Sequence, residues 1–248
     1  MRSLRAAVKL LALTGWSALF LLPGAAAKLR RRRIERGARL TRAWAAGCLK
    51  ILGGKVEVEG EALPEGGGLI VSNHLSYLDI MVQASVLKVR FAPKIEMRKW
   101  PLVGQLTGFS NPVWIDRKRR GRAGEAESAM LAALREDVPL LVYPEGTSGD
   151  GSMLMPFKST CFSAAVKADA AIYPILLRYE KPADGTSLPW FGNAALLPHI
   201  WRVMGLKEFR CRMYIMGKIR PGAVERKKLA AGVRDAMANQ YRRWKANA

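Results

Sequence analysis

The chain has few of the side chains that transfer protons or bind metals at neutral pH. Its 248 residues include two histidines, His74 and His199, so a mechanism that uses an imidazole must use one of them. The three cysteines, Cys48, Cys161 and Cys211, are widely spaced and form no C-x-x-C pair, which argues against a zinc site or a redox motif. We expect reduced thiols in a cytosolic environment and no bound metal.

Acidic residues are also scarce, with 20 Asp and Glu against 41 Lys and Arg, which gives a net charge of +21. Such a charge suits nucleic acid, an anionic membrane surface or a phosphorylated substrate, and it does not choose among them. More than half of the net charge lies in residues 1–50, where Glu35 is the only acid. Basic motifs interleaved with aromatic residues are absent, which counts against nucleic acid as the partner.

One long stretch without charge runs from Leu10 to Ala27, and Lys28 and Arg30–Arg33 follow it directly. This pattern predicts an anchor at an anionic membrane surface, to which each nearby base contributes about 1 kcal/mol. The stretch is at the lower limit of length for a full span, and Pro23 with Gly24 would bend or end its helix. The stretch therefore fits either a helix that spans the membrane or one that lies in the plane of its surface.

A secretory signal is the alternative, because the first ten residues are basic and Ala25-Ala26-Ala27 resembles a cleavage site. The basic run that follows opposes translocation, and nothing later in the chain suggests an oxidised exported domain. We therefore predict membrane-anchoring helices over residues 1–50 and one domain over residues 51–248. The domain is expected at the cytoplasmic face of the inner (plasma) membrane.

Short β-rich runs alternate with helical patterns after residue 50, and two of the runs, 140–143 and 172–178, are almost entirely apolar. This alternation predicts an α/β fold with a largely parallel central sheet flanked by helices, in which sites form at the carboxyl ends of strands. The last helix is amphipathic and basic; packing on the core is expected, and a second membrane contact is the alternative. Strands are expected at 56–59, 69–72, 89–92, 112–115, 140–143, 172–178 and 211–216, and helices at 77–87, 124–136, 157–167 and 224–245.

The most informative histidine is His74, which follows the predicted strand 69–72 and precedes Asp79 by five residues. Asp79 could accept a hydrogen bond from one imidazole nitrogen and leave the other nitrogen as a base. The alternative is structural, because Ser76-x-x-Asp79 is also a helix-capping pattern. Both interpretations can hold together. His199 has no comparable carboxylate nearby in the sequence.

Two further segments also end predicted strands. The run from Leu140 to Gly151 enters a glycine-rich loop that can present N–H groups to an anion, and Glu145 can hold a hydroxyl or a basic group; a plain turn is the alternative. Arg117 follows the predicted strand 112–115 and can bind a phosphate bidentately, whereas a solvated basic loop is the alternative. Pro174 belongs at a sheet edge or a bulge, because proline cannot donate to a ladder. The absence of Gly-x-Ser-x-Gly favours direct attack by a substrate hydroxyl.

Taken in order, four segments resemble the motifs of the phospholipid/glycerol acyltransferase family, which includes the 1-acylglycerol-3-phosphate acyltransferases. The resemblance covers about Lys55 to Gly217. It also takes in Lys94 and the stretch Trp100-Pro101-Leu102-Val103-Gly104. The four segments are Asn73-His74-x4-Asp79, Ile115-Asp116-Arg117, Tyr143-Pro144-Glu145-Gly146-Thr147 and Ile172-Tyr173-Pro174-Ile175.

The resemblance implies an O-acyltransferase that moves a fatty acyl group from acyl-CoA or acyl carrier protein to the free hydroxyl of 1-acyl-glycerol-3-phosphate, forming phosphatidic acid. By the same resemblance, His74 takes the hydroxyl proton and Asp79 orients His74. No cofactor is expected beyond the acyl donor. The residues expected to bind substrate are Asn73, Lys94, Arg117, Glu145, Gly146, Thr147 and Lys158.

The chain departs from the family pattern Phe-Pro-Glu-Gly-Thr-Arg-Ser at two positions, where Tyr143 replaces Phe and Ser148 stands in place of the arginine. Loss of a guanidinium weakens the grip on a phosphate unless Lys94, Lys158 or the basic residues from Arg117 compensate. This form of the loop resembles the lyso-ornithine lipid acyltransferase branch, so a lyso-ornithine lipid is the alternative acceptor. A basic peripheral membrane-binding protein is the non-enzyme alternative.

Overall fold

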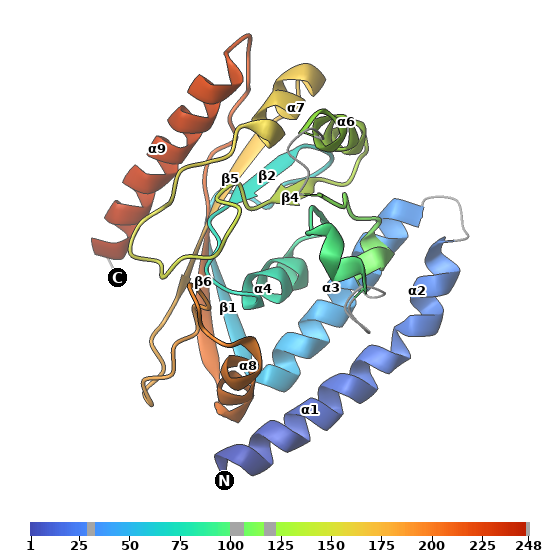
Figure 1. The fold of residues 1–248 in the computed structure, drawn as a ribbon, viewed down its shortest axis with the longest axis vertical. Helices are drawn as coiled ribbons and strands as arrows, with labels where there is room; N and C mark the ends of the chain where they lie inside the picture. Colours follow the sequence, from blue (N-terminus) through green and yellow to red (C-terminus); the bar gives the residue numbers. More distant parts are fainter. Residues whose placement is uncertain (29–32, 100–106, 117–122, 247–248) are drawn as a thin grey trace.

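The computed structural model describes residues 1–248 except 29–32, 100–106, 117–122 and 247–248. Its described part contains a six-stranded sheet with helices on both faces (Figure 1), as the sequence predicts. The strands are β1 (Gly54–Gly60), β2 (Leu69–Ser72), β3 (Arg90–Phe91), β4 (Leu140–Val142), β5 (Ile172–Tyr179) and β6 (Phe209–Ile215). The helices are α1 (Arg2–Leu19), α2 (Leu21–Lys28), α3 (Arg33–Leu52), α4 (Leu78–Val86), α6 (Ala123–Leu134), α7 (Thr160–Ala168), α8 (Leu196–Gly205) and α9 (Arg226–Ala246), with short 3-10 turns η1 (Ile95–Lys99) and η2 (Gly108–Ser110).

The sheet has the strand order β1-β6-β5-β2-β4-β3. Each neighbouring pair is parallel except β5 with β6, so the prediction of a largely parallel sheet is confirmed. Strand β2 lies in the middle, between β5 and β4, and all four of its residues are buried. Sites in such sheets form at the carboxyl ends of the strands, so the carboxyl end of β2 is an expected position for a site.

Two hydrophobic cores cover the two faces of the sheet. The first contains Leu49 of α3, Leu78 of α4 and Val203 of α8. The second contains Phe162 of α7 and Met237 of α9. Strand β2 contributes to both, because successive strand side chains point to opposite faces. The helices α1, α3, α4 and α8 thus lie on one face, and α6, α7 and α9 lie on the other (Figure 1).

Helix α1 packs along α3 and α8 through polar contacts that its apolar sequence does not predict. Nζ of Lys9 is buried and donates to the carbonyl oxygens of Leu52 and Leu206 at 2.6 and 2.8 Å. These carbonyls lie at the carboxyl ends of α3 and α8, where a cation is favourable. Further along, the indole of Trp16 donates to the Trp44 carbonyl and lies against Gly47, the close approach being allowed because glycine has no side chain.

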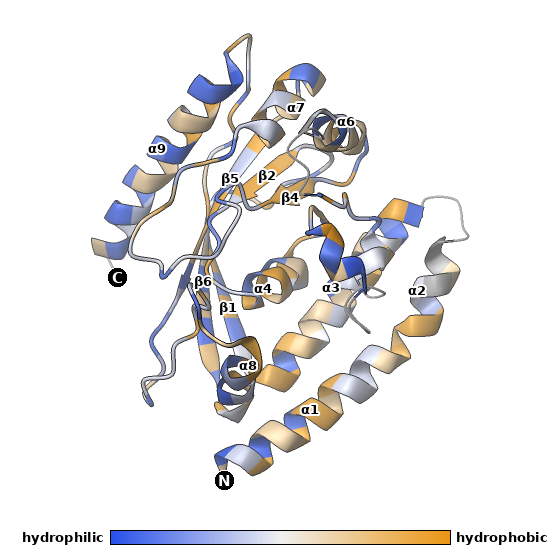
Figure 2. Ribbon diagram, in the orientation of Figure 1, coloured by the Kyte–Doolittle hydropathy of each residue, from blue (hydrophilic) through white to orange (hydrophobic). Residues whose placement is uncertain are grey.

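The opposite side of α1 carries exposed apolar side chains, and Figure 2 colours many residues of this helix as hydrophobic. Leu4, Val8 and Leu11 are 71%, 57% and 74% exposed. By length and composition, the helical stretch Arg2–Gly24 suffices to cross a membrane. Since one side of α1 is bonded to the domain and the other is apolar, the packed arrangement suits a helix lying in the membrane surface.

Helix α8 was not predicted from the sequence. The structure shows why proline is tolerated there: Pro198 lies in the first turn, where the missing N–H has no partner within the helix. The predicted strand 112–115 is reduced to a bridge between Ile115 and Lys94. It follows a left-handed residue, Asn111 with φ 51°, which ends η2.

Pro174 lies in β5, which has neighbours on both sides, so the expectation of an edge position is wrong. The alternative, a bulge, is confirmed. Ile175 pairs with Ile215, whereas Ile172 bridges Ile219. Between these two pairs, the segment that follows β6 has one residue more than β5. This bulge interrupts the ladder beside Pro174, where a regular ladder would need an N–H group.

Candidate active site

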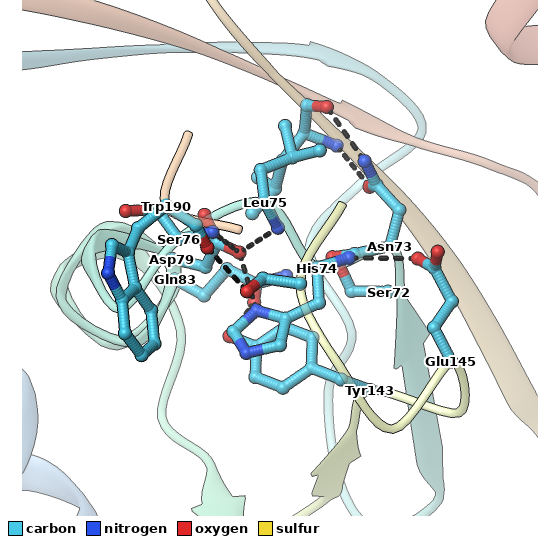
Figure 3. Close-up of polar contacts among 12 residues, drawn as sticks. Ser72, Asn73, His74, Leu75, Ser76, Asp79, Gln83, Tyr143, Glu145 and Trp190 are labelled. Atoms are coloured by element: carbon cyan, nitrogen blue, oxygen red, sulfur yellow. Dashed lines mark hydrogen bonds and ion pairs between the residues drawn. The ribbon is translucent and has the colours of Figure 1, made fainter. Parts of the chain in front are cut away.

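His74 and Asp79 meet at the carboxyl end of β2, where the chain enters α4 (Figure 3). Nδ1 of His74 lies 2.7 Å from Oδ2 of Asp79. The carboxylate is fully buried, and the imidazole keeps 20% of its side-chain surface exposed. Because a carboxylate accepts, Nδ1 carries the proton and Nε2 presents its lone pair. Nε2 makes no hydrogen bond to the part of the chain that the structure describes, so it is open to a ligand.

Asp79 also holds the entry to α4. Its Oδ2 accepts the main-chain N–H groups of Leu75 at 2.6 Å and Ser76 at 3.0 Å. Only one of the two hydrogen bonds of a capping box is therefore present. The Asp79 carboxylate accepts from the Ser76 N–H, but the buried Ser76 hydroxyl has no hydrogen-bond partner among the described residues. The residue that precedes α4 is Tyr77 rather than Ser76. One carboxylate thus fixes both the helix start and the imidazole.

A third side chain, Tyr179 at the end of β5, completes the shell of the carboxylate. Its hydroxyl donates to Oδ1 of Asp79 at 2.7 Å. Burial, together with the nearby negative charge of Asp79, raises the pKa of Tyr179 well above its usual range, so the hydroxyl stays protonated and remains a donor. The sequence reasoning missed this contact, since Tyr179 lies a hundred residues from Asp79.

The imidazole is also held from one side by an aromatic ring. The Tyr143 ring stacks on His74, with a centroid separation of 4.1 Å and an interplanar angle of 13° (Figure 3). The Tyr143 hydroxyl donates to Oε1 of Gln83 at 2.7 Å. Gln83 lies one helical turn after Asp79, and this spacing was the signal that could have included it in the site. The tyrosine that replaces the family's phenylalanine therefore has a defined partner.

Asn73 and Glu145 connect the His74 loop to its neighbours. The Asn73 amide donates to the Leu177 carbonyl at 3.0 Å and accepts the Leu177 N–H at 2.7 Å. The Glu145 carboxylate accepts the N–H groups of His74 and Met155, both at 3.0 Å. Burial raises the pKa of Glu145, although the two N–H groups oppose this shift. Both side chains, predicted to bind substrate, are engaged with the main chain in the structure, which indicates a positioning role.

The loop after β4 brings Gly146, Thr147 and Lys158 together on the surface. Gly146 has φ +77°, a conformation that favours glycine, and a Cβ at this position would lie 2.6 Å from Nζ of Lys158. Thr147 and Lys158 are exposed. This cluster presents a hydroxyl and a cation beside the Glu145 turn, as an anionic head group would require.

The remaining predicted binding residues lie near the end of β3 or outside the described residues. Lys94 is exposed and bridges Ile115, which brings the second motif segment beside the strand end. Arg117 lies outside the described residues, so its predicted phosphate contact stays a prediction. The Ser148 hydroxyl donates to the Trp190 carbonyl. The position of the family's arginine is thus occupied by a neutral side chain bonded to the main chain.

Comparisons with known proteins agree with this geometry. The profile of the Acyltransferase family matches residues 55–178. A relative named lyso-ornithine lipid O-acyltransferase, from Pseudomonas aeruginosa, is 30% identical over 202 residues, which cover 80% of this chain and 77% of that protein. The chain belongs to the acyltransferase family.

Two further similarities extend the comparison of this acyltransferase. The 1-acyl-sn-glycerol-3-phosphate acyltransferase of Neisseria meningitidis is 29% identical over 157 residues, and the match covers 62% of each chain. The crystal structure of the 1-acyl-sn-glycerophosphate (LPA) acyltransferase PlsC from Thermotoga maritima has a TM-score of 0.71 at 21% identity. It covers 99% of this chain and 98% of its own. This last likeness shows the shared fold, and family membership makes the protein an enzyme rather than a basic binding protein.

The second histidine of the acyltransferase lies beside the site without joining it. His199 is 3% exposed in α8, and its Nδ1 lies 3.2 Å from the Tyr77 hydroxyl. Burial lowers the pKa of His199, so it is neutral near pH 7. No carboxylate is bonded to it in the described residues. Within the same residues, no group of three His, Cys, Asp or Glu side chains is arranged to hold a metal ion.

Proposed function

We propose that the protein transfers a fatty acyl group from an acyl thioester, acyl-CoA or acyl carrier protein, to the free hydroxyl of 1-acyl-glycerol-3-phosphate. Nε2 of His74 takes the hydroxyl proton as the oxygen attacks the thioester carbonyl. The new C–O ester bond forms, the C–S bond breaks, and the imidazolium returns the proton to the leaving thiolate. The products are phosphatidic acid and a free thiol. No metal or prosthetic group takes part.

One observation carries this proposal: Nδ1 of His74 is bonded to a buried carboxylate, while the partly exposed ring leaves Nε2 without a hydrogen bond to the described residues. A carboxylate in this position fixes the tautomer and stabilises the imidazolium that forms as the hydroxyl loses its proton. The Tyr143 stack and the hydrogen bonds of Asp79 restrict the ring further. A base held in this way is suited to activating a substrate hydroxyl for direct attack on the acyl thioester.

Lyso-ornithine lipid is the second candidate acceptor, and Ser148 favours it. A neutral hydroxyl bonded to Trp190 occupies the position at which the family pattern has an arginine, so one cation for a phosphate is missing there. Lys158 beside Gly146, and Lys94 at the end of β3, supply cations that favour the phosphate-bearing acceptor instead. The two acceptors therefore differ in how strongly they depend on these lysines.

The membrane is the proposed source of the acceptor. The exposed apolar side of α1 suits contact with lipid. Bases follow it in the chain, with Lys28 at the end of α2 and Arg33 at the start of α3. We place the catalytic domain at the cytoplasmic face, since the basic run opposes translocation. Both the lysolipid and its product are membrane lipids, so an enzyme anchored at the surface meets them without extracting them into water.

The test is transfer of a labelled acyl group by the purified protein to each lysolipid in mixed micelles. We expect transfer to 1-acyl-glycerol-3-phosphate, and loss of transfer in His74→Ala with an unchanged melting temperature. His199→Gln is the matched control, since it alters the other histidine and should retain activity. Transfer to lyso-ornithine lipid alone would select the second acceptor. Activity in His74→Ala would remove the assignment of the base.

A further inference from the structure

The last turn of α9 carries a cluster of exposed bases, Arg242, Arg243 and Lys245. The described residues form no ion pair with these three side chains; Arg242 donates to Asn239 on its own helix. The single acid within α9, Asp235, is bonded to Arg234 instead. Helix α9 packs by its buried side chains, so Arg242 and Arg243 are not needed to hold it. We call these three residues the α9 basic end.

The α9 basic end lies at the rim of the active site. The Tyr241 hydroxyl and Nζ of Lys245 both donate to the Gly151 carbonyl, at 3.0 and 3.3 Å. Gly151 in turn packs against Leu75, the residue after His74. In Figure 1 the loop that follows β4 runs to the carboxyl-terminal end of α9. One loop thus separates the bases from the imidazole.

The position of α9 argues against lipid as the partner of these bases. The apolar exposed side of α1 belongs to the layer that contains α3 and α8, whereas α9 lies on the opposite face of the sheet (Figure 1). A flat bilayer that contacts α1 does not reach the far layer of the domain. The α9 basic end therefore faces the aqueous side, where its partner must be soluble and anionic.

The form of the surface favours an acidic protein over a small anion. The bases lie on the outside of a helix, exposed to water, and do not converge on a buried polar group as a pocket for a small ligand requires. Rim charges of this kind increase the association rate of a partner of opposite charge. Two nearby acids reduce the positive field: Asp150, on the loop beside Lys245, and Glu59, which accepts from the Trp244 indole.

We propose that the α9 basic end is the docking surface for an acidic carrier protein that presents the acyl thioester to His74. The inference rests on the proposed acyl transfer and names the donor that this site takes. The carrier would bring its thioester from the aqueous side while the lysolipid enters from the membrane. The two substrates would then reach the imidazole from opposite sides.

The experiment compares two donors that carry the same acyl chain, acyl carrier protein and CoA. The variant Arg242→Glu/Arg243→Glu should lower the ratio of kcat/KM for the carrier protein to kcat/KM for acyl-CoA by about 10-fold or more, mainly through KM. The matched control is Lys227→Glu/Lys228→Glu, which makes the same charge change at the other end of α9 and should leave the ratio unchanged. If the charge-reversed variant does not fold, Arg242→Gln/Arg243→Gln replaces it. This neutral variant should lower the same ratio by a smaller factor.

Each outcome distinguishes this inference from the proposed function. Equal losses with both donors, or an equal loss in the control, would overturn the docking surface. Weaker binding of the Arg242→Glu/Arg243→Glu variant to phosphatidylglycerol vesicles would assign the bases to the membrane instead. A wild-type protein that uses acyl-CoA and rejects the carrier protein would overturn this inference alone. Absence of transfer from either donor would overturn the acyl-transfer proposal as well.

Discussion

Replacing Asp79 by Asn should separate its two roles, because the amide keeps the size of the carboxylate and removes its charge. In the structure, Oδ2 accepts from His74, Leu75 and Ser76, and Oδ1 accepts from Tyr179. The amide oxygen can replace Oδ2, and the amide nitrogen can donate to the Tyr179 oxygen. The helix entry therefore keeps its acceptor, whereas the imidazole loses its counter-charge.

The magnitudes differ for the two roles. A hydrogen bond to a charged group contributes about 1.5–3 kcal/mol and a neutral one about 0.5–1.5 kcal/mol, so the three bonds on Oδ2 lose about 3 kcal/mol together. The lower cost of burying a neutral amide offsets part of this, and we expect the free energy of unfolding to fall by about 1–3 kcal/mol. General-base catalysis contributes about 10²–10⁴-fold, and kcat should fall by about that factor.

The assay measures kcat with saturating lysolipid and acyl thioester, alongside urea denaturation of the same samples. Tyr179→Phe is the matched comparison, because it removes the hydrogen bond on Oδ1 and leaves the His74 contact in place. It should lower stability with a smaller loss of kcat than Asp79→Asn. If Asp79→Asn is folded, less stable and fully active, Asp79 is a structural residue at the start of α4 and the orienting role is refuted.

Three further changes test other contacts. Glu145→Gln should lower the free energy of unfolding by about 1–3 kcal/mol in urea denaturation, since an amide nitrogen would face one of its two main-chain N–H groups; unchanged stability would contradict this role of the carboxylate. Gly47→Ala should expose α1 to limited proteolysis, because the added methyl would lie 2.1 Å from the Trp16 ring, and equal protection would contradict the packing. His199→Gln should reduce the fall in Tm below about pH 6.5. Burial lowers the pKa of His199 in the folded protein, so as the pH falls the unfolded chain takes up the proton first and the folded state loses stability. An equal fall in both proteins would show that His199 does not contribute.

Local patterns were sufficient for much of the fold. The apolar run at 69–72 and the helical spacing after it predicted β2 and α4, because period and burial are encoded within a few neighbouring residues. Helix α8 was missed although a proline in the first turn and an amphipathic pattern are both helix signals. The central position of Pro174 was missed because the strand order is not local.

The sequence by itself determined that His74 and Asp79 would lie close together, since five residues separate them across a strand-to-helix junction. It also indicated the family, through four segments in a fixed order. Only the tertiary structure decided what surrounds this pair. Tyr179 and Tyr143 reach the pair from β5 and from the end of β4, and Asn73 is bonded to a strand a hundred residues away. Sheet order places these side chains, and no spacing along the chain records it.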